Sequence, residues 1–99
     1  MKLIGLLGAF GWKTTATYYR LINEYTHREL GGAHTARILL HSLNSHGVDH
    51  HQQRNEWAQI GEILGEGGKN LKAGGADFII LTSNSLHRVA DLVQTKSEL

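Results

Sequence analysis

Three short runs of apolar residues divide the chain. They are KLIGLLG (2–8), ARILLHSL (36–43) and ADFIIL (76–81), and glycine or polar residues bound each of them. Runs of about four to eight apolar residues between turn-forming residues are typical of strands that are buried on both faces. We therefore predict three strands at these positions.

The segments between and after these runs carry apolar residues at helical spacing. The spacing predicts helices over 14–30, 56–75 and 85–96. Thr14 or Thr15 is the candidate N-cap of the first helix, and Gly31-Gly32 is its stop signal. Each of these three helices would then cross from one strand to the next or follow the last strand.

Two segments weaken this pattern. The second helix contains glycines at 61, 65, 67 and 68, and each costs about 1 kcal/mol relative to alanine at an exposed helix position. We therefore expect that helix to fray or kink around Gly65–Gly68. The stretch NSHGVDHHQQ (44–53) is polar and irregular, with a helix that could begin near Val48.

The resulting order is βαβαβα, in a single domain over residues 1–99. Continuous apolar strands separated by helices predict a three-stranded parallel sheet with helices on both faces and right-handed crossovers. Ligands of such sheets bind outside the carboxyl ends of the strands, near the point where the strand order reverses. Those ends are GAFGW (8–12), HSLNS (41–45) and TSNS (82–85).

Composition narrows the class of protein. The 99 residues carry a net charge of +1 and no basic tract, which does not favour nucleic-acid binding. No apolar run approaches the roughly 20 residues of a membrane span, and no small-residue cleavage site follows the first run. We therefore expect a cytoplasmic protein. The lack of cysteine excludes a disulfide scaffold, a thiolate nucleophile and a cysteine-ligated metal.

Two candidate sites have ordinary structural explanations. GAFGW (8–12) could hold an anion at a helix N-terminus, but it matches neither G-x-G-x-x-G nor a P-loop, and a tight turn explains it as well. A metal site is suggested by His46, Asp49, His50 and His51, of which His46 and His50 would share a helix face. No H-E-x-x-H motif is present, so we prefer a solvated loop and expect no metal.

The richest polar cluster is LTSNSLH (81–87). Ser85 could cap the last helix, and Asn84 offers both a donor and an acceptor in the turn. Ser83 would need a base to act as a nucleophile, and His87 cannot be assumed to reach it across a turn. From the residues alone, helix capping and a functional site are both open.

The motifs IGLLG..GW..T..YYRLINE and SNSLH belong to a longer likeness. From Met1 to about Leu92, the sequence resembles the N-terminal lobe of the aspartate/glutamate racemase family. The resemblance implies a cofactor-independent racemase with two similar α/β lobes and an amino acid in the cleft between them. An acid/base residue from each lobe, usually cysteine, faces each side of Cα. One removes the α-proton, and the other delivers a proton to the opposite face.

The resemblance also assigns roles to five positions. Ser83 matches the first acid/base position, and Asn84 and Ser85 match positions that hold the α-carboxylate of the substrate. Phe10 falls where a methionine commonly lines the pocket, and Gln52 matches a polar position that reaches towards the substrate. The implied partner is aspartate or glutamate, with no cofactor, metal, nucleic acid or membrane.

Departures from the family pattern lower the expected activity. A thiol has a pKa near about 8.5, whereas the aliphatic hydroxyl of Ser83 is far harder to ionise. Lys13 stands where the family often has glutamate, and Gly11 where it often has serine. These 99 residues lack the second lobe and its cysteine. We expect a truncated half-site of low activity.

Two arrangements would complete such a half-site. A homodimer could bring two copies of Ser83 to one cleft, or a separate polypeptide could carry the second lobe. The alternative is a non-catalytic module that binds a small anion or an amino acid.

Overall fold

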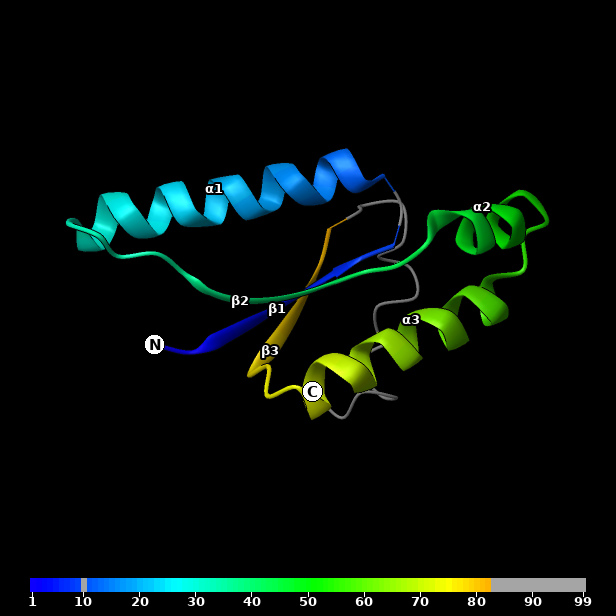
Figure 1. Ribbon diagram of the computed structural model, residues 1–99. Helices are drawn as coiled ribbons and strands as arrows, with labels where there is room; N and C mark the ends of the chain where they lie inside the picture. Colours follow the sequence, from blue (N-terminus) through cyan, green and yellow to red (C-terminus); the bar gives the residue numbers. More distant parts are fainter. Residues whose placement is uncertain (10, 83–99) are drawn as a thin grey trace.

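The structure, a computed structural model, describes residues 1–9 and 11–82. Its strands are β1 (Leu3–Gly8), β2 (Arg37–Ser42) and β3 (Phe78–Leu81). Its helices are α1 (Trp12–Leu30), α2 (Ser45–Gln53) and α3 (Trp57–Ala73). Figure 1 shows their order along the chain, with both α2 and α3 between β2 and β3. The helix predicted over 85–96 lies outside the described residues.

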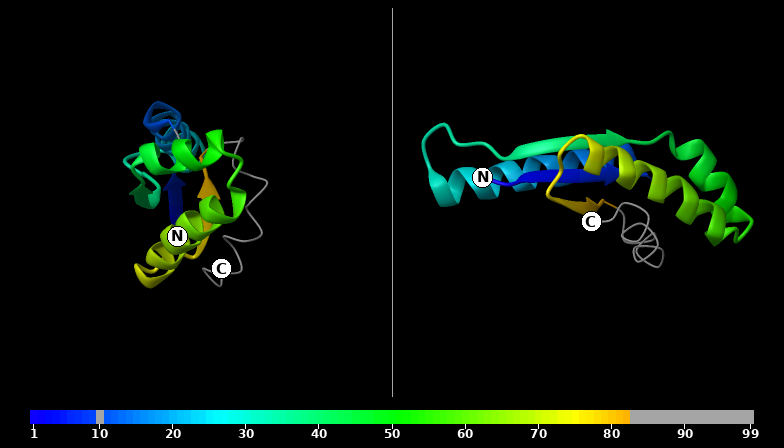
Figure 2. Two further views of the ribbon diagram at one scale, coloured as in Figure 1. Left: turned by 90° about the vertical axis from the view of Figure 1, so that its right-hand side faces the viewer. Right: turned by 90° about the horizontal axis from the view of Figure 1, so that it is seen from below.

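The strands form a parallel sheet in the order β2-β1-β3. β1 pairs in parallel with both neighbours, so all three strands run in the same direction. In this register, Leu7 of β1 is paired with His41 of β2 and with Leu81 of β3. The chain moves from β1 to one side through α1 and crosses to the other side of β1 through α3. α1 and α3 lie on opposite faces of the sheet (Figure 2). The predicted three-stranded parallel sheet with helices on both faces is confirmed.

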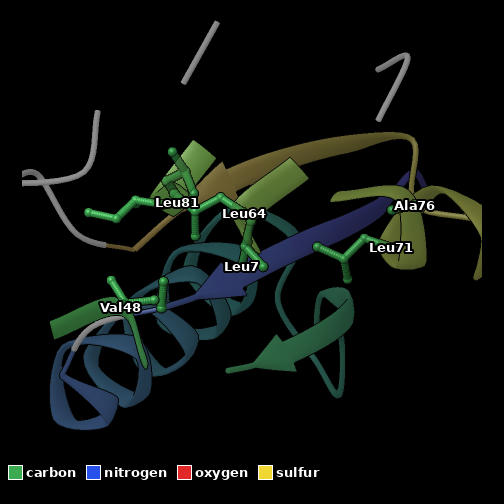
Figure 3. Close-up of a cluster of buried hydrophobic side chains, with 8 residues drawn as sticks. Leu7, Val48, Leu64, Leu71, Ala76 and Leu81 are labelled. Atoms are coloured by element: carbon green, nitrogen blue, oxygen red, sulfur yellow. The ribbon is translucent and has the colours of Figure 1, made fainter. Parts of the chain in front are cut away.

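The main core lies between the sheet and α3. Successive side chains of a strand point to opposite faces, which places Leu7 on the face that α3 covers. Leu7 and Leu64 are fully buried, and Val48 of α2 and Leu81 of β3 belong to the same cluster. Figure 3 shows these side chains gathered between the strands and the helices. The carboxyl ends of β1 and β3 are therefore anchored by this core.

α3 runs without interruption despite its internal glycines. All four are buried: Gly61, Gly65, Gly67 and Gly68. A Cβ added to Gly67 would lie 2.7 Å from Cδ1 of Leu7, closer than real Cβ atoms approach. The predicted fraying or kinking is wrong, because the glycines allow a close packing that offsets their low helix propensity.

α1 begins at Trp12, earlier than the predicted start, and neither predicted N-cap is correct. The N-cap is Gly11, whose φ of 76° is readily adopted by glycine, a residue without a side chain that could cap the helix. Thr15, a predicted cap, is buried instead. The predicted stop is confirmed at Gly31, which has a φ of 71°.

The polar stretch 44–53 forms α2 rather than an irregular segment. The Oδ1 atom of Asn44 accepts a hydrogen bond from the backbone N–H of His46 at 3.0 Å, which caps the helix. α2 therefore starts at Ser45, before the start predicted near Val48. Val48 is fully buried and anchors α2 on the core.

Candidate functional site

The carboxyl ends of β1 and β3 lie at the point where the strand order reverses. β1 ends at Gly8 and β3 at Leu81, and the residues that follow them, Ala9 and Thr82, are buried. α1 begins at the same edge, because its N-cap Gly11 follows β1 closely (Figure 1). This is the position at which open α/β sheets bind ligands.

A buried pair of hydroxyl groups joins α1 to the end of β3. The Oγ1 atoms of Thr15 and Thr82 are 2.8 Å apart, and the two residues are 3% and 1% exposed. The N–H of Thr82 donates to the carbonyl oxygen of Leu7 at 3.2 Å, and its hydroxyl lies 3.4 Å from that oxygen. The pair thus ties both segments to β1. The sequence alone does not reveal this pair, because nothing in a linear pattern pairs residues so far apart.

Gly8 leaves space for this hydroxyl pair. A Cβ at Gly8 would lie 2.5 Å from Oγ1 and 3.0 Å from Cγ2 of Thr15. We expect Gly8→Ala to lower the free energy of unfolding by about 1–3 kcal/mol, measured by urea denaturation. Gly47→Ala is the matched control, because a Cβ there has nothing within 4 Å. Alanine at this position inside α2 should raise the free energy of unfolding by up to about 1 kcal/mol. Effects of the same sign and size would contradict this packing.

The start of α1 adds polar groups to the same edge. The N–H groups of Thr14 and Thr15 bond to the carbonyl oxygen of Gly11 at 3.0 and 3.4 Å, which forms the first helical turn. Trp12 is 70% exposed, and Nζ of Lys13 lies 5.7 Å from its ring centroid. The first turn therefore presents a cation and a helix N-terminus, both of which favour an anion. The anion site over 8–12 stays a prediction.

Of the five residues that the racemase resemblance singles out, one lies within the described part of the chain. Gln52 is half-buried on α2, the helix that follows the carboxyl end of β2. The other four lie outside the described residues: Phe10, Ser83, Asn84 and Ser85. Ser83 directly follows Thr82 in the sequence.

The connection from α2 to α3 is held by Glu56. The Nδ1–H of His51 donates to Oε1 of Glu56 at 3.1 Å, and Nε of Arg54 lies 3.2 Å from the same oxygen. The pKa of the Glu56 carboxyl is lowered from its ordinary value of 4.5, mainly by the hydrogen bond from His51. Partial burial opposes this effect, and the positive charge of Arg54 adds to it. These contacts fix the C-terminal end of α2, where Gln52 lies.

Lowering the pH is expected to destabilise the wild type more steeply than Glu56→Gln. A carboxyl whose pKa is lower in the folded state favours folding while it is ionised. Its contribution is present above about pH 4.5 and is lost as the pH falls through the lowered pKa. Urea denaturation between neutral and acidic pH measures the slope. Glu24→Gln, which breaks an exposed pair with Arg20, controls for the loss of a surface carboxylate. Equal slopes for the wild type and Glu56→Gln would refute this role.

The histidines of α2 do not form a metal site with other described residues. His46 and His50 are exposed on one helix face, whereas Asp49 accepts a hydrogen bond from Gln53 at 3.0 Å. Within residues 1–9 and 11–82, no three His, Asp or Glu side chains are arranged to hold a metal ion. The same residues include no helix that is long and apolar enough to cross a membrane.

Two surface hollows lie away from the hydroxyl pair. One, of about 510 Å³, lies between β2 and α3, and Glu62 and Glu66 make its lining acidic. A dicarboxylate would be repelled by this charge. The other, of about 340 Å³, lies at the amino ends of β1 and β2, beside Ile4 and Tyr25. Neither is lined by Thr15 or Thr82.

Comparison with known proteins adds an independent line of evidence. The crystal structure of a protein from Yersinia pestis, assigned as an Asp/Glu racemase, matches with a TM-score of 0.97 at 35% sequence identity. That of an aspartate racemase homologue from Pyrococcus horikoshii OT3 matches with a TM-score of 0.87 at 26% identity. Each match covers 100% of this chain and 43% of the other chain. The chain therefore spans less than half the length of these relatives.

The model of one protein family, described as Asp/Glu/hydantoin racemase, matches residues 7–99. That range includes the carboxyl ends of all three strands and the residues that the resemblance singled out. The chain belongs to the Asp/Glu/hydantoin racemase family.

Proposed function

We propose that this chain forms one half of a cofactor-independent amino-acid racemase site that binds aspartate or glutamate at the carboxyl ends of β1 and β3. The observation that carries the proposal is the likeness of the entire chain to the Yersinia pestis protein, with a TM-score of 0.97. The reversal of strand order at this edge supports the location. In this proposal residues 1–99 are one domain of a cytoplasmic protein.

Each proposed site residue has a separate task. Ser83 stands at the acid/base position on one face of Cα, directly after the buried end of β3. Asn84 and Ser85 hold the α-carboxylate with N–H and hydroxyl donors. Phe10 lines the pocket, and Gln52 reaches from α2 towards the substrate.

Racemisation needs a proton acceptor on one face of Cα and a proton donor on the other. The acceptor removes the α-proton, which leaves a carbanion, and the donor delivers a proton to the opposite face. Ser83 supplies one hydroxyl, which is a weak base because it is hard to ionise. The sequence contains no cysteine that could replace it. We therefore propose low activity for this half-site.

A second copy of the chain would complete the site in the simplest way. The Yersinia pestis and Pyrococcus horikoshii proteins are more than twice as long as this chain, so their chains contain material for a further lobe. Trp12 is 70% exposed at the proposed site, and a large exposed aromatic residue is typical of a contact surface. A dimer would place two hydroxyls, and no thiol, around one amino acid.

The wild type is expected to show little or no exchange of the α-proton of aspartate or glutamate in D₂O. NMR follows the loss of the Cα–H signal, and ultracentrifugation measures the oligomeric state in the same buffer. Clear exchange by a monomer would contradict the low activity proposed for this half-site. Exchange per chain that grows with protein concentration would indicate that a second copy completes the site.

The second candidate is a non-catalytic module that binds an amino acid or another small anion. The absence of cysteine favours it, because a missing thiol weakens proton abstraction far more than it weakens binding. Calorimetry with aspartate, glutamate and phosphate tests it. Saturable binding of aspartate without α-proton exchange would support this candidate, and no binding of any of the three would exclude it.

A further inference from the structure

We propose that the Thr15–Thr82 hydroxyl pair positions the end of β3, and with it Ser83, relative to the start of α1. This inference rests on the proposed function of that edge. Thr82 is joined to Ser83 by one peptide bond, and Thr15 lies in the first turns of α1. The pair therefore connects the two segments from which the proposed site is built. Thr15 and Thr82 act as positioning residues and do not react themselves.

The hydroxyl pair sets a spacing that apolar packing would not reproduce. The two Oγ1 atoms are 2.8 Å apart, whereas carbon atoms in contact lie about 3.5–4.0 Å apart. Valine at both positions keeps the shape of the side chains but should separate α1 from the end of β3 by about 1 Å. Thr15 cannot recede freely, because it already lies tightly against Gly8.

Both hydroxyls are satisfied within this arrangement. When Thr82 directs its hydroxyl to the carbonyl oxygen of Leu7, 3.4 Å away, it accepts a hydrogen bond from Thr15. Removal of one hydroxyl alone leaves the other buried without its partner, which is costly. Removal of both leaves no such group, so the double valine variant should be nearly as stable as the wild type.

The double variant therefore distinguishes a pair that positions the end of β3 from a pair that does not. If the pair has no positioning role, Thr15→Val/Thr82→Val would keep the wild-type amide exchange at residues 82–85 and the wild-type Kd. If the pair positions the end of β3, the double variant would fold but present a displaced site. A displacement of about 1 Å in a binding or catalytic group is enough to weaken function strongly.

The experiment compares the wild type with Thr15→Val/Thr82→Val and with Thr15→Ser/Thr82→Ser, which keeps both hydroxyls. The urea midpoint reports stability, amide hydrogen exchange of residues 82–85 reports local opening, and an NMR titration gives the Kd for aspartate. We expect the valine variant to keep the wild-type midpoint. Its amides at 82–85 should exchange about tenfold faster or more, and its Kd should rise about tenfold or more. The serine variant should restore both values.

Wild-type exchange at residues 82–85 together with an unchanged Kd in the valine variant would overturn the proposal. Should that variant fail to fold, Thr15→Val and Thr15→Ser are compared in the same way, and equal exchange at 82–85 in these two variants would overturn it. If the wild type binds neither aspartate nor glutamate, the proposed function fails. The ratio of amide exchange rates then decides the positioning role on its own.

Discussion

Ser83→Cys is expected to increase the rate of α-proton exchange from aspartate in D₂O by about 10²–10⁴-fold, the usual contribution of a positioned acid/base group. A thiol with a pKa near about 8.5 supplies some thiolate at neutral pH, whereas an aliphatic hydroxyl supplies almost none. In the proposed site the new thiolate faces the α-proton. NMR measures the exchange as loss of the Cα–H signal.

The stereochemistry of this exchange tests the half-site. A single base returns a deuteron to the face from which it took the proton, so the aspartate should keep its configuration. Thr35→Cys is the matched control, because it places a thiol on an exposed residue just before β2, at the opposite edge of the sheet. Equal rates for the two cysteine variants would contradict the role of Ser83. Inversion of aspartate would show that a second acid/base group completes the site.

Leu64→Ala is expected to lower the free energy of unfolding by about 2–5 kcal/mol. Leu64 is fully buried on α3 and belongs to the cluster that includes Leu7, the residue before the end of β1 (Figure 3). Truncation removes apolar contacts and leaves a cavity that the neighbouring elements fill only in part. The total free energy of unfolding of a small domain is about 5–15 kcal/mol, so this loss is a large fraction of its stability. Urea denaturation followed by circular dichroism measures it.

Leu21→Ala provides the comparison for this variant. Leu21 is 51% exposed on α1, and a substitution there should change the stability by about 0.5 kcal/mol or less. The same amino-acid change is thus made at a buried position of α3 and at an exposed position of α1. Equal losses at Leu64 and Leu21 would contradict the assignment of the main core to the α3 face of the sheet.

The sheet was predictable from the sequence because its strands are short apolar runs, although only β1 is largely buried and β2 and β3 are partly exposed. Apolar runs bounded by glycine or polar residues locate β1, β2 and β3 to within a few residues, and the order of the elements implies parallel pairing. The stop of α1 at Gly31 was also predictable, since its positive φ suits glycine. These features depend on local sequence alone.

Other features depend on capping and on contacts in the folded chain, and they were missed or placed imprecisely. α2 forms in a polar stretch because Asn44 caps it and Val48 is buried. α3 tolerates its glycines because they allow close packing against residues such as Leu7. Thr15 was predicted to cap α1, but it bonds to Thr82 across 67 positions of sequence.

The candidate site was predicted in a different way from the fold. The rule that ligands bind at the carboxyl ends of strands points to the edge at which the site is proposed. The roles of Ser83 and Asn84 came from resemblance to a family, and spacing alone left helix capping equally open. The family is confirmed by the match over residues 7–99, whereas these residue roles stay predictions.

The central claim is that an acidic amino acid binds at the carboxyl ends of β1 and β3. Titration of the ¹⁵N-labelled chain with L-aspartate, followed through the backbone amide signals, tests it most directly. The account predicts saturable shifts at residues 8–15 and 82–85. An absence of saturable shifts, or shifts confined to the opposite edge around residues 33–37 and 74–77, would contradict it.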